Sequence, residues 1–380
     1  MVWRFNIIPR ETLLLAGLIA IIAAFFSVTT FAAHAYHRQQ EQFGGQWYQR
    51  GERALKRSRP AEAVEDFRNA LAYSRDNDLY RLRLAQALMA DNRPQEARSH
   101  LLSLWDKEPG DGTLNLELAR LAAMWGDTRQ AIRYYHAAIY GVWPDEPTAH
   151  RWQLRFELSE YLLQRNTIQD TKDAQAELVA LAAELPPQDG AGQARLGALF
   201  LRAGLYARAL AACRAALAGQ PNLMAALQGA GEAAFQMGEY QTARHYLLPV
   251  VAQNPRDEHS LELLNLSESI LKLDPLERGL SSREQAHRAV HDFQLALARA
   301  QKCASAAVPA AASSGGDLAA LVQQAKSTRP SENALAREPD ALEKTMAMVF
   351  KLEKAAALCG PPGLEDNALT VLGQRWEASR

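Results

Sequence analysis

Residues 191–221 read AGQARLGALFLRAGLYARALAACRAALAGQP, and residues 225–255 read AALQGAGEAAFQMGEYQTARHYLLPVVAQNP. The two segments carry glycine, alanine and proline at matching places 34 residues apart, so that Ala209 corresponds to Ala243. The same pattern recurs through the middle of the chain at intervals of 34, 34, 43, 35 and 34 residues. Its alanines are Ala63, Ala97, Ala131, Ala174, Ala209 and Ala243. A period of this length is typical of stacked helix pairs and not of a closed enzyme domain.

The residues around each alanine give the repeat a physical meaning. A small residue usually stands 12 positions earlier and a larger one four positions later, as Gly51 and Phe67 do around Ala63. Small residues let two antiparallel helices approach closely, and the larger residue fills the space beside them on the same face. We therefore expect close helix packing at Gly51, Ala63, Phe67, Ala85, Ala97, Ala119, Ala131, Ala174, Gly197, Ala209, Gly231 and Ala243.

Two further columns mark where the helices end. Gly126, Gly204 and Gly238 each stand five residues before their alanine, and Asn92 holds that place in the second repeat. Glycine or asparagine there predicts a C-terminal helix cap with positive φ. A proline follows four of the alanines by 12 residues and predicts the end of the second helix.

This pattern resembles the tetratricopeptide repeat family over about residues 44–256. The resemblance implies an all-α fold, a right-handed α-solenoid of about six stacked helix pairs. The fourth repeat departs from the pattern, because it follows additional residues at 142–150 and has an atypical turn at 164–170. We expect this repeat to bend the superhelix or to interrupt it.

In arrays of this family the first helices of successive repeats line the concave face, which implies a partner-binding surface there. The residues that we expect to point inward are Tyr48, Glu52, Arg83, Gln86, Glu117, Arg120, Glu160, Arg195, Arg202, Gln228, Glu232 and Phe235. This amphipathic set suits a protein or peptide segment. An ordinary solvated face is the alternative. The family's clamp for a C-terminal carboxylate needs paired lysine and asparagine residues, which Glu52, Gln86 and Glu117 do not supply.

The N-terminal residues 13–33 carry no charge, and about 20 apolar residues suffice for a helix to cross a bilayer core. We expect a retained transmembrane signal anchor after a short tail at residues 1–12, because the run is longer than the apolar part of a typical signal peptide. A cleaved signal peptide, suggested by Ala33-His34-Ala35, is one alternative. An amphipathic or buried helix is another.

The charges beside this run favour a single-pass protein of the inner membrane with its large domain in the periplasm. Arg4 and Arg10 precede the run, although several basic residues from Arg50 to Arg59 weaken the bias. Gly44-Gly45 follows the run and is a candidate hinge between the anchor and the repeats.

The chain after the repeats divides into three segments. Residues 257–303 predict capping helices, residues 304–316 a flexible linker and residues 317–380 a C-terminal helical segment that folds back on the last repeat. A disulfide between Cys303 and Cys359 would join these helices across the linker and would fit an oxidising compartment. Two buried free thiols are the alternative.

Charge and motifs exclude several classes of function. The chain has 42 Lys+Arg against 43 Asp+Glu, without the excess of cations that a nucleic-acid binder needs. His287 and His291 share a helix face, but Arg288 stands where a zincin has glutamate, so a solvated face is the better interpretation. We expect no enzymatic activity, no cofactor or metal and no small-molecule substrate.

The expected function is therefore that of a membrane-anchored scaffold. Its concave face would bind a protein or peptide segment, and residues 13–33 would bind the lipid bilayer. Two alternatives remain at this point: a structural subunit of a larger membrane complex, and a chaperone-like factor for translocated proteins.

Overall fold

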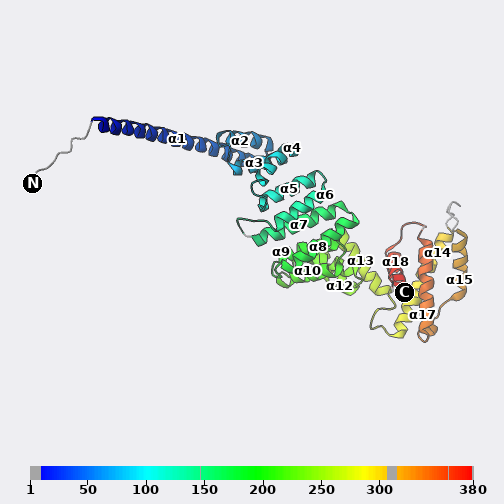
Figure 1. Ribbon diagram of the computed structural model, residues 1–380. Coiled ribbons are helices and arrows are strands. Elements are labelled where there is room, and N and C mark those ends of the chain that lie inside the picture. The colour runs from blue at the N-terminus through cyan, green and yellow to red at the C-terminus, as the bar shows by residue number, and fades with distance from the viewer. Residues whose placement is uncertain (1–9, 146, 306–314, 358, 379–380) are drawn as a thin grey trace, which may run out of the picture. The chain divides into compact units, whose positions relative to one another are not determined.

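The computed structural model describes residues 10–145, 147–305, 315–357 and 359–378, and these residues form helices and no strand (Figure 1). The helices of the repeat region are α1 (Arg10–Lys56), α2 (Pro60–Tyr73), α3 (Asp78–Ala90), α4 (Pro94–Trp105), α5 (Gly112–Met124), α6 (Thr128–Ile139), α7 (Pro147–Arg165), α8 (Ile168–Glu184), α9 (Gly190–Arg202), α10 (Tyr206–Gly219), α11 (Met224–Gln236) and α12 (Tyr240–Gln253). They are followed by α13 (Glu258–Leu273), α14 (Ser282–Ser305), α15 (Gly315–Thr328), α16 (Glu332–Leu335), α17 (Pro339–Ala356) and α18 (Leu364–Ala378).

The chain divides into two compact bodies, residues 1–158 and residues 159–380, which we call the N-terminal and C-terminal bodies. The division falls inside α7, between Leu158 and Ser159. Helix α7 belongs to the fourth repeat, so the boundary between the bodies falls in the repeat that departs from the sequence pattern.

The six repeating alanines all lie on the second helices of their repeats, and each is 0% exposed. The small residues on the first helices face the larger residue that follows the alanine. A Cβ atom added to Gly51 would come within 2.7 Å of Phe67, and one added to Gly231 within 2.5 Å of Leu247. Glycine therefore sets the distance between the two helices of these repeats.

The predicted positive-φ caps are confirmed. Gly126, Gly204 and Gly238 have φ of 73°, 75° and 74°, and Asn92 has φ of 57°. The structure adds Ser58 in the first repeat and Asn166 in the fourth, with φ of 56° and 52°. Every repeat thus turns between its helices through one left-handed residue, which glycine and asparagine adopt most readily. In the fourth repeat this residue lies eight positions before Ala174, and not five.

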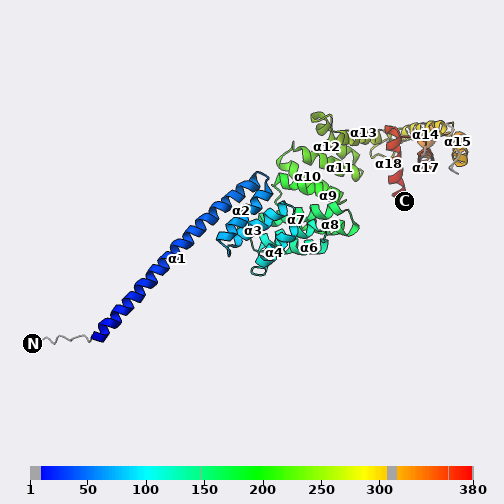
Figure 2. The same cartoon turned by 90° about the horizontal axis from the view of Figure 1, so that it is seen from above.

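The N-terminal helix α1 is unbroken, so the predicted hinge at Gly44-Gly45 is wrong. Gly44 is buried in this helix, and a Cβ atom there would lie 3.1 Å from Ser74 Oγ and 3.4 Å from Tyr80. The missing side chain of Gly44 lets the start of α3 and the loop before it pack closely against α1. This glycine therefore serves packing and not flexibility. Figure 2 shows α1 as one straight helix whose C-terminal part packs beside α2.

The segment Gly17–Lys56 of α1 is long and apolar enough to cross a membrane, with a mean hydropathy of 2.0 over its most apolar window, none of which is buried. The same helix ends as the first helix of the first repeat, where Ala54 is 5% exposed. The apolar run and the repeat array therefore share one continuous helix.

The additional residues before the fourth repeat form an ordered connection. The backbone N–H of Gly112 donates to Val142 O at 3.0 Å, and the N–H of Val142 donates to Gly110 O at 2.8 Å. The Trp143 indole packs on Gly112, donates its N–H to Ala138 O at 2.9 Å and stacks on His150. Trp143 stands where other repeats have proline, and it fixes this connection by packing.

Of the C-terminal helices, which the sequence predicts to fold back on the last repeat, α18 contacts it. Helix α18 packs against α13, and Arg375 of α18 donates to Gly238 O at 3.1 Å and lies 5.1 Å above the Tyr240 ring. Helix α14 extends to Ser305 and α15 begins at Gly315, so most of the predicted linker lies outside the described residues.

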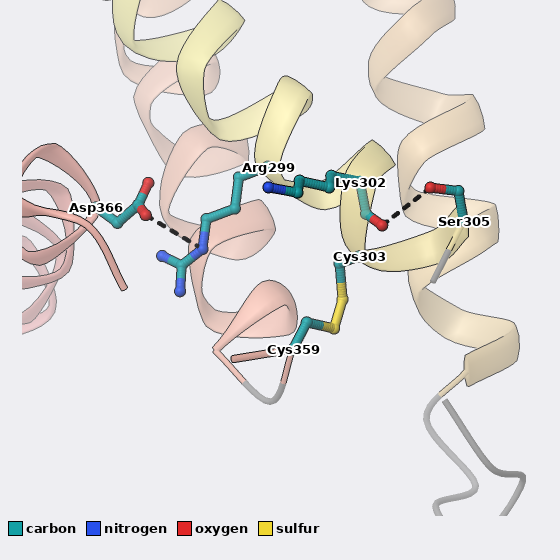
Figure 3. Close-up of a disulfide and its surroundings, with 6 residues drawn as sticks. All are labelled: Arg299, Lys302, Cys303, Ser305, Cys359 and Asp366. Carbon is teal, nitrogen blue, oxygen red and sulfur yellow. Dashed lines mark hydrogen bonds and ion pairs between the residues drawn. A yellow bond between two sulfur atoms is a disulfide. The ribbon is translucent and has the colours of Figure 1, made fainter. Parts of the chain in front are cut away.

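A disulfide joins Cys303 near the end of α14 to Cys359 after α17, with a Cα–Cα distance of 5.4 Å (Figure 3). One turn before Cys303, Arg299 pairs with Glu353 of α17 and lies 3.5 Å from Asp366 of α18. The arginine and the disulfide thus tie α14 to both later helices.

Candidate partner-binding face

The predicted inward-facing residues of the N-terminal body pair with one another across neighbouring repeats. Glu52 Oε1 of α1 lies 3.1 Å from Arg83 Nε of α3, and Gln86 Nε2 of α3 donates to Glu117 Oε1 of α5 at 2.7 Å. In both pairs, the residue directly after the small residue of one first helix meets the residue two places before the small residue of the next. We call such a pair a rung.

The third rung has more hydrogen bonds than the other two of the N-terminal body. Arg120 donates to both carboxylate oxygens of Glu157 at 2.8 and 2.9 Å, and the Tyr135 hydroxyl donates to the same carboxylate at 2.9 Å. The hydrogen bonds to Glu157 raise the pKa of Arg120 further above its usual range. A bidentate arginine–carboxylate pair is geometrically specific. Arg120 therefore holds α5 to α7 and is not free for a partner.

Glu157 was missed in the sequence because the fourth repeat is out of phase. Its alanine predicts the small residue at Leu162, whereas the structure places the 0% exposed Ser159 in that role. The longer turn around Asn166 accounts for the three-residue shift. Once the shift is applied, Glu157 lies in the same column as Arg83 and Glu117, so the longer turn is the signal that would have found it.

One rung follows in the C-terminal body, and then the series stops. Glu160 Oε1 of α7 accepts from Arg195 of α9 at 2.7 Å. At the next junction the two rung positions hold Ala198 and Gly229, which have no polar side chain. Gly229 instead packs against the Sγ atom of the buried Cys213.

Arg202 lies on the first helix next to this gap. Its side chain is exposed, and within the described part of the chain it has no hydrogen-bond or ion-pair partner. The guanidinium of Arg202 is therefore not paired among the described residues and is available to a partner.

The remaining predicted residues of the C-terminal body contact α13. Gln228 Nε2 donates to Asp257 Oδ2 at 2.6 Å, and Glu232 lies 3.6 Å from His259 Nε2. The hydrogen bond from Ser260 lowers the pKa of Asp257 and keeps it an acceptor. Asp257 and His259 were not predicted, because they follow the last recognisable repeat.

Two aromatic residues of the predicted face are mainly structural. Tyr48 stacks on Tyr80 with ring centroids 5.0 Å apart and lies 5.7 Å from Phe67. Phe235 is half-buried and meets Tyr240 edge to face at 5.5 Å. Both rings fill the junction between neighbouring helices.

Comparison with known proteins agrees with the repeat pattern. Residues 54–114 match the family model of the tetratricopeptide repeat, from the end of α1 to the start of α5. Among curated proteins, no sequence matches this chain.

Several solved structures are similar to the chain at low identity. One is YrrB, described as a tetratricopeptide repeat protein with an unusual peptide-binding site, at 16% identity and TM-score 0.40 over 52% of this chain and 97% of that one. A second is pilF of Pseudomonas aeruginosa, at 14% identity and TM-score 0.42 over 59% and 97%. A third is a tetratricopeptide repeat protein of Parabacteroides merdae, at 15% identity and TM-score 0.41 over 74% of this chain and 99% of that one.

The matched segment, the buried alanines in phase and the positive-φ turn in every repeat lead to one assignment. The middle of the chain folds as a solenoid of tetratricopeptide repeats.

Proposed function

We propose that this protein is a membrane-anchored, non-catalytic scaffold that captures a protein segment on the face formed by α9 and α11. The observation that carries the proposal is the end of the rungs at Ala198 and Gly229, beside Arg202, which is unpaired among the described residues. Where a rung forms, the protein satisfies its own polar groups. Where it does not, an exposed guanidinium is available to a carboxylate of a bound segment.

The surroundings of Arg202 favour an extended or helical polypeptide with an acidic residue. Ala198 is exposed one turn before Arg202, and the half-buried Glu232 stands at the matching place on α11. A surface with one free cation, small apolar residues and flanking polar groups suits a peptide better than a compact ligand.

The proposed membrane anchor is supported by the hydrogen bonds that polar side chains in the apolar part of α1 form with the backbone of the same helix. Ser27 Oγ donates to Ala23 O at 2.7 Å, and the hydroxyls of Thr29 and Thr30 donate to Phe26 O, each at 2.9 Å. A helix in hydrocarbon must satisfy its polar groups internally, as these three residues do. The exposed Phe25, Phe26 and Phe31 alongside them suit contact with lipid.

We place the large domain on the periplasmic side of the inner membrane. The basic residues before the apolar run favour a cytoplasmic N-terminus. A disulfide such as Cys303–Cys359 persists in an oxidising compartment. Protection of the repeats from protease added to spheroplasts would place them in the cytoplasm instead.

The test of the binding face compares two arginines of the same body. Arg202→Glu should reduce recovery of bound proteins from mildly solubilised membranes by roughly tenfold, the effect of losing one charged contact. Arg208→Glu on α10 is the control, because Arg208 is also exposed and unpaired within the described residues but lies on a second helix. Equal recovery with both variants would rule out the proposed face.

The rungs also favour one alternative, a structural subunit of a larger membrane complex. A face that satisfies its own charges, as that of the N-terminal body does, needs no ligand to be stable. Co-purification separates the two functions. A fixed stoichiometric set of proteins indicates a subunit, whereas a varied set that exchanges indicates a scaffold or a chaperone-like factor.

A further inference from the structure

The loops between the repeats of the N-terminal body lie along one edge, on the side from which the anchor enters. Phe43 of α1 contacts Tyr73 at the end of α2, with ring centroids 5.7 Å apart. Lys107, in the next loop, lies 2.7 Å from Asp78 at the start of α3. The third loop joins this series through the hydrogen bond from Gly112 N–H to Val142 O. We call these loops, together with the helix residues that flank the first of them, the anchor-side edge; it comprises residues 73–79, 106–111 and 140–145.

Large apolar side chains are concentrated on this edge. Among the described residues of the N-terminal body after Phe43, six large apolar side chains are exposed. Four of them belong to the anchor-side edge: Tyr73 at 38%, Leu79 at 50%, Tyr140 at 70% and Val142 at 74% exposed. Concentrated exposed apolar groups mark interaction surfaces.

The two most exposed of these residues are held in place by hydrogen bonds, Val142 through its backbone and Tyr140 through its hydroxyl. Val142 is fixed by both hydrogen bonds of its bridge to residues 110–112, and the Tyr140 hydroxyl accepts from Arg155 at 3.1 Å. Side chains ordered before binding lose little conformational entropy when a partner covers them.

The charge of the edge identifies the kind of partner. Its loops carry acidic residues well in excess of their two basic residues, Arg75 and Lys107. The turns at the opposite edge have no such acidic excess, since they carry Arg57, Arg59 and Arg93 against Asp91 and Asp127. Anionic lipid headgroups attract basic and repel acidic segments. The edge nearest the anchor is therefore unsuited to lipid and complementary to a basic polypeptide.

We propose that the anchor-side edge binds the basic juxtamembrane segment of another membrane protein. Such a segment carries lysine or arginine directly beside its membrane span, together with apolar or aromatic residues. Acidic loop residues would pair with its cations, while Tyr140, Val142 and Leu79 would cover its apolar side chains. The inference rests on the proposed anchor, but not on the proposed face at Arg202.

The experiment places the full chain in phosphatidylcholine nanodiscs with a synthetic single-span peptide. One peptide carries four lysines, a tyrosine and a leucine beside its span, and a matched peptide carries four glutamates in place of the lysines. A photoreactive phenylalanine analogue replaces Leu79, or Met124 as the control. Both residues are 50% exposed, and Met124 lies at the opposite edge.

The lysine peptide should crosslink at position 79 roughly tenfold more than the glutamate peptide, and more than at position 124. Val142→Asp combined with Tyr140→Ser should reduce the yield at position 79. Equal yields for the two peptides, or crosslinks to lipid at position 79 that no peptide displaces, would overturn the proposal. Incorporation of the chain into nanodiscs tests the anchor separately, so failure of the anchor and failure of the edge remain distinguishable.

Discussion

The first helices of repeats one to four and those of repeats five and six look alike in sequence but differ in structure. In the earlier repeats the charged residues of the predicted binding face meet as rungs, from Glu52–Arg83 to Glu160–Arg195. At the junction of α9 and α11 the rung positions are apolar, and Arg202 stays unpaired within the described residues. A charged residue on such a face joins repeats where the next repeat supplies its complement. It is available to a partner only where that complement is missing.

Overpacking a helix pair tests whether the early and late repeats have the same kind of close helix packing although their candidate binding faces differ. Ala97→Leu on α4 and Ala209→Leu on α10 each add bulk at a position that is 0% exposed, and each should cost about 1–3 kcal/mol of folding free energy. Thermal unfolding in mild detergent would measure the loss. Ala218→Leu is the control, because Ala218 lies exposed on α10. Unchanged melting of Ala97→Leu and Ala209→Leu would refute the packing described for these repeats.

Charge reversal at two arginines addresses the difference between the faces directly. Arg120→Glu would place a third carboxylate beside Glu117 and Glu157, whereas Arg202→Glu removes no contact within the described residues. Because Arg120 is 40% exposed, solvent screening limits the expected cost to about 1–2 kcal/mol. Arg202→Glu should stay within about 0.5 kcal/mol of the parent.

The measurement is again thermal unfolding of both variants under one condition. Similar melting temperatures for the two would mean that the rung at Arg120 contributes no more than an ordinary surface charge. The distinction between a paired and an open face would then fail.

The sequence predicted those features of the repeats that depend on residues near each other in the chain. The buried alanines and the caps at Asn92, Gly126, Gly204 and Gly238 follow from spacing within a single helix pair. What it missed depends on distant neighbours. Gly44 suggested a hinge because the sequence does not reveal that Ser74 and Tyr80 lie against it.

The sequence predicted which residues belong to the candidate face, but not which of them pair with one another and which stay open to a partner. Arg120 directly follows the small residue of its helix, whereas Arg202 stands one turn later in its own helix; Arg120 meets a neighbour in the next repeat, and Arg202 meets none within the described residues. For Arg120 that neighbour is Glu157, 37 residues away and hidden by the phase shift of the fourth repeat. Predicting whether a residue on this face pairs within the protein therefore requires knowing which residues of adjacent repeats lie opposite one another. The repeat period alone does not give this.

The smallest predicted effect concerns the pH dependence of the second rung. Burial raises the pKa of Glu117, whose side chain is 8% exposed and accepts from Gln86. The folded state therefore binds this proton more tightly than the unfolded state, in which the pKa is about 4.3. Stability contributed by the protonated form is complete below that value and is lost as the pH rises to the pKa of the folded state.

Glu117→Gln keeps an acceptor for Gln86 but removes the titration. Relative to the parent, this variant should gain stability as the pH rises above about 4.3, and the difference should level off once Glu117 is ionised in both states. Denaturant unfolding of both proteins across this range would measure it. Glu160→Gln is the matched control, because Glu160 belongs to a rung whose carboxylate is 35% exposed. If the two variants showed the same pH dependence, the burial of Glu117 would have no effect on stability that the more exposed Glu160 lacks. The Gln86–Glu117 and Glu160–Arg195 rungs would then respond alike to pH.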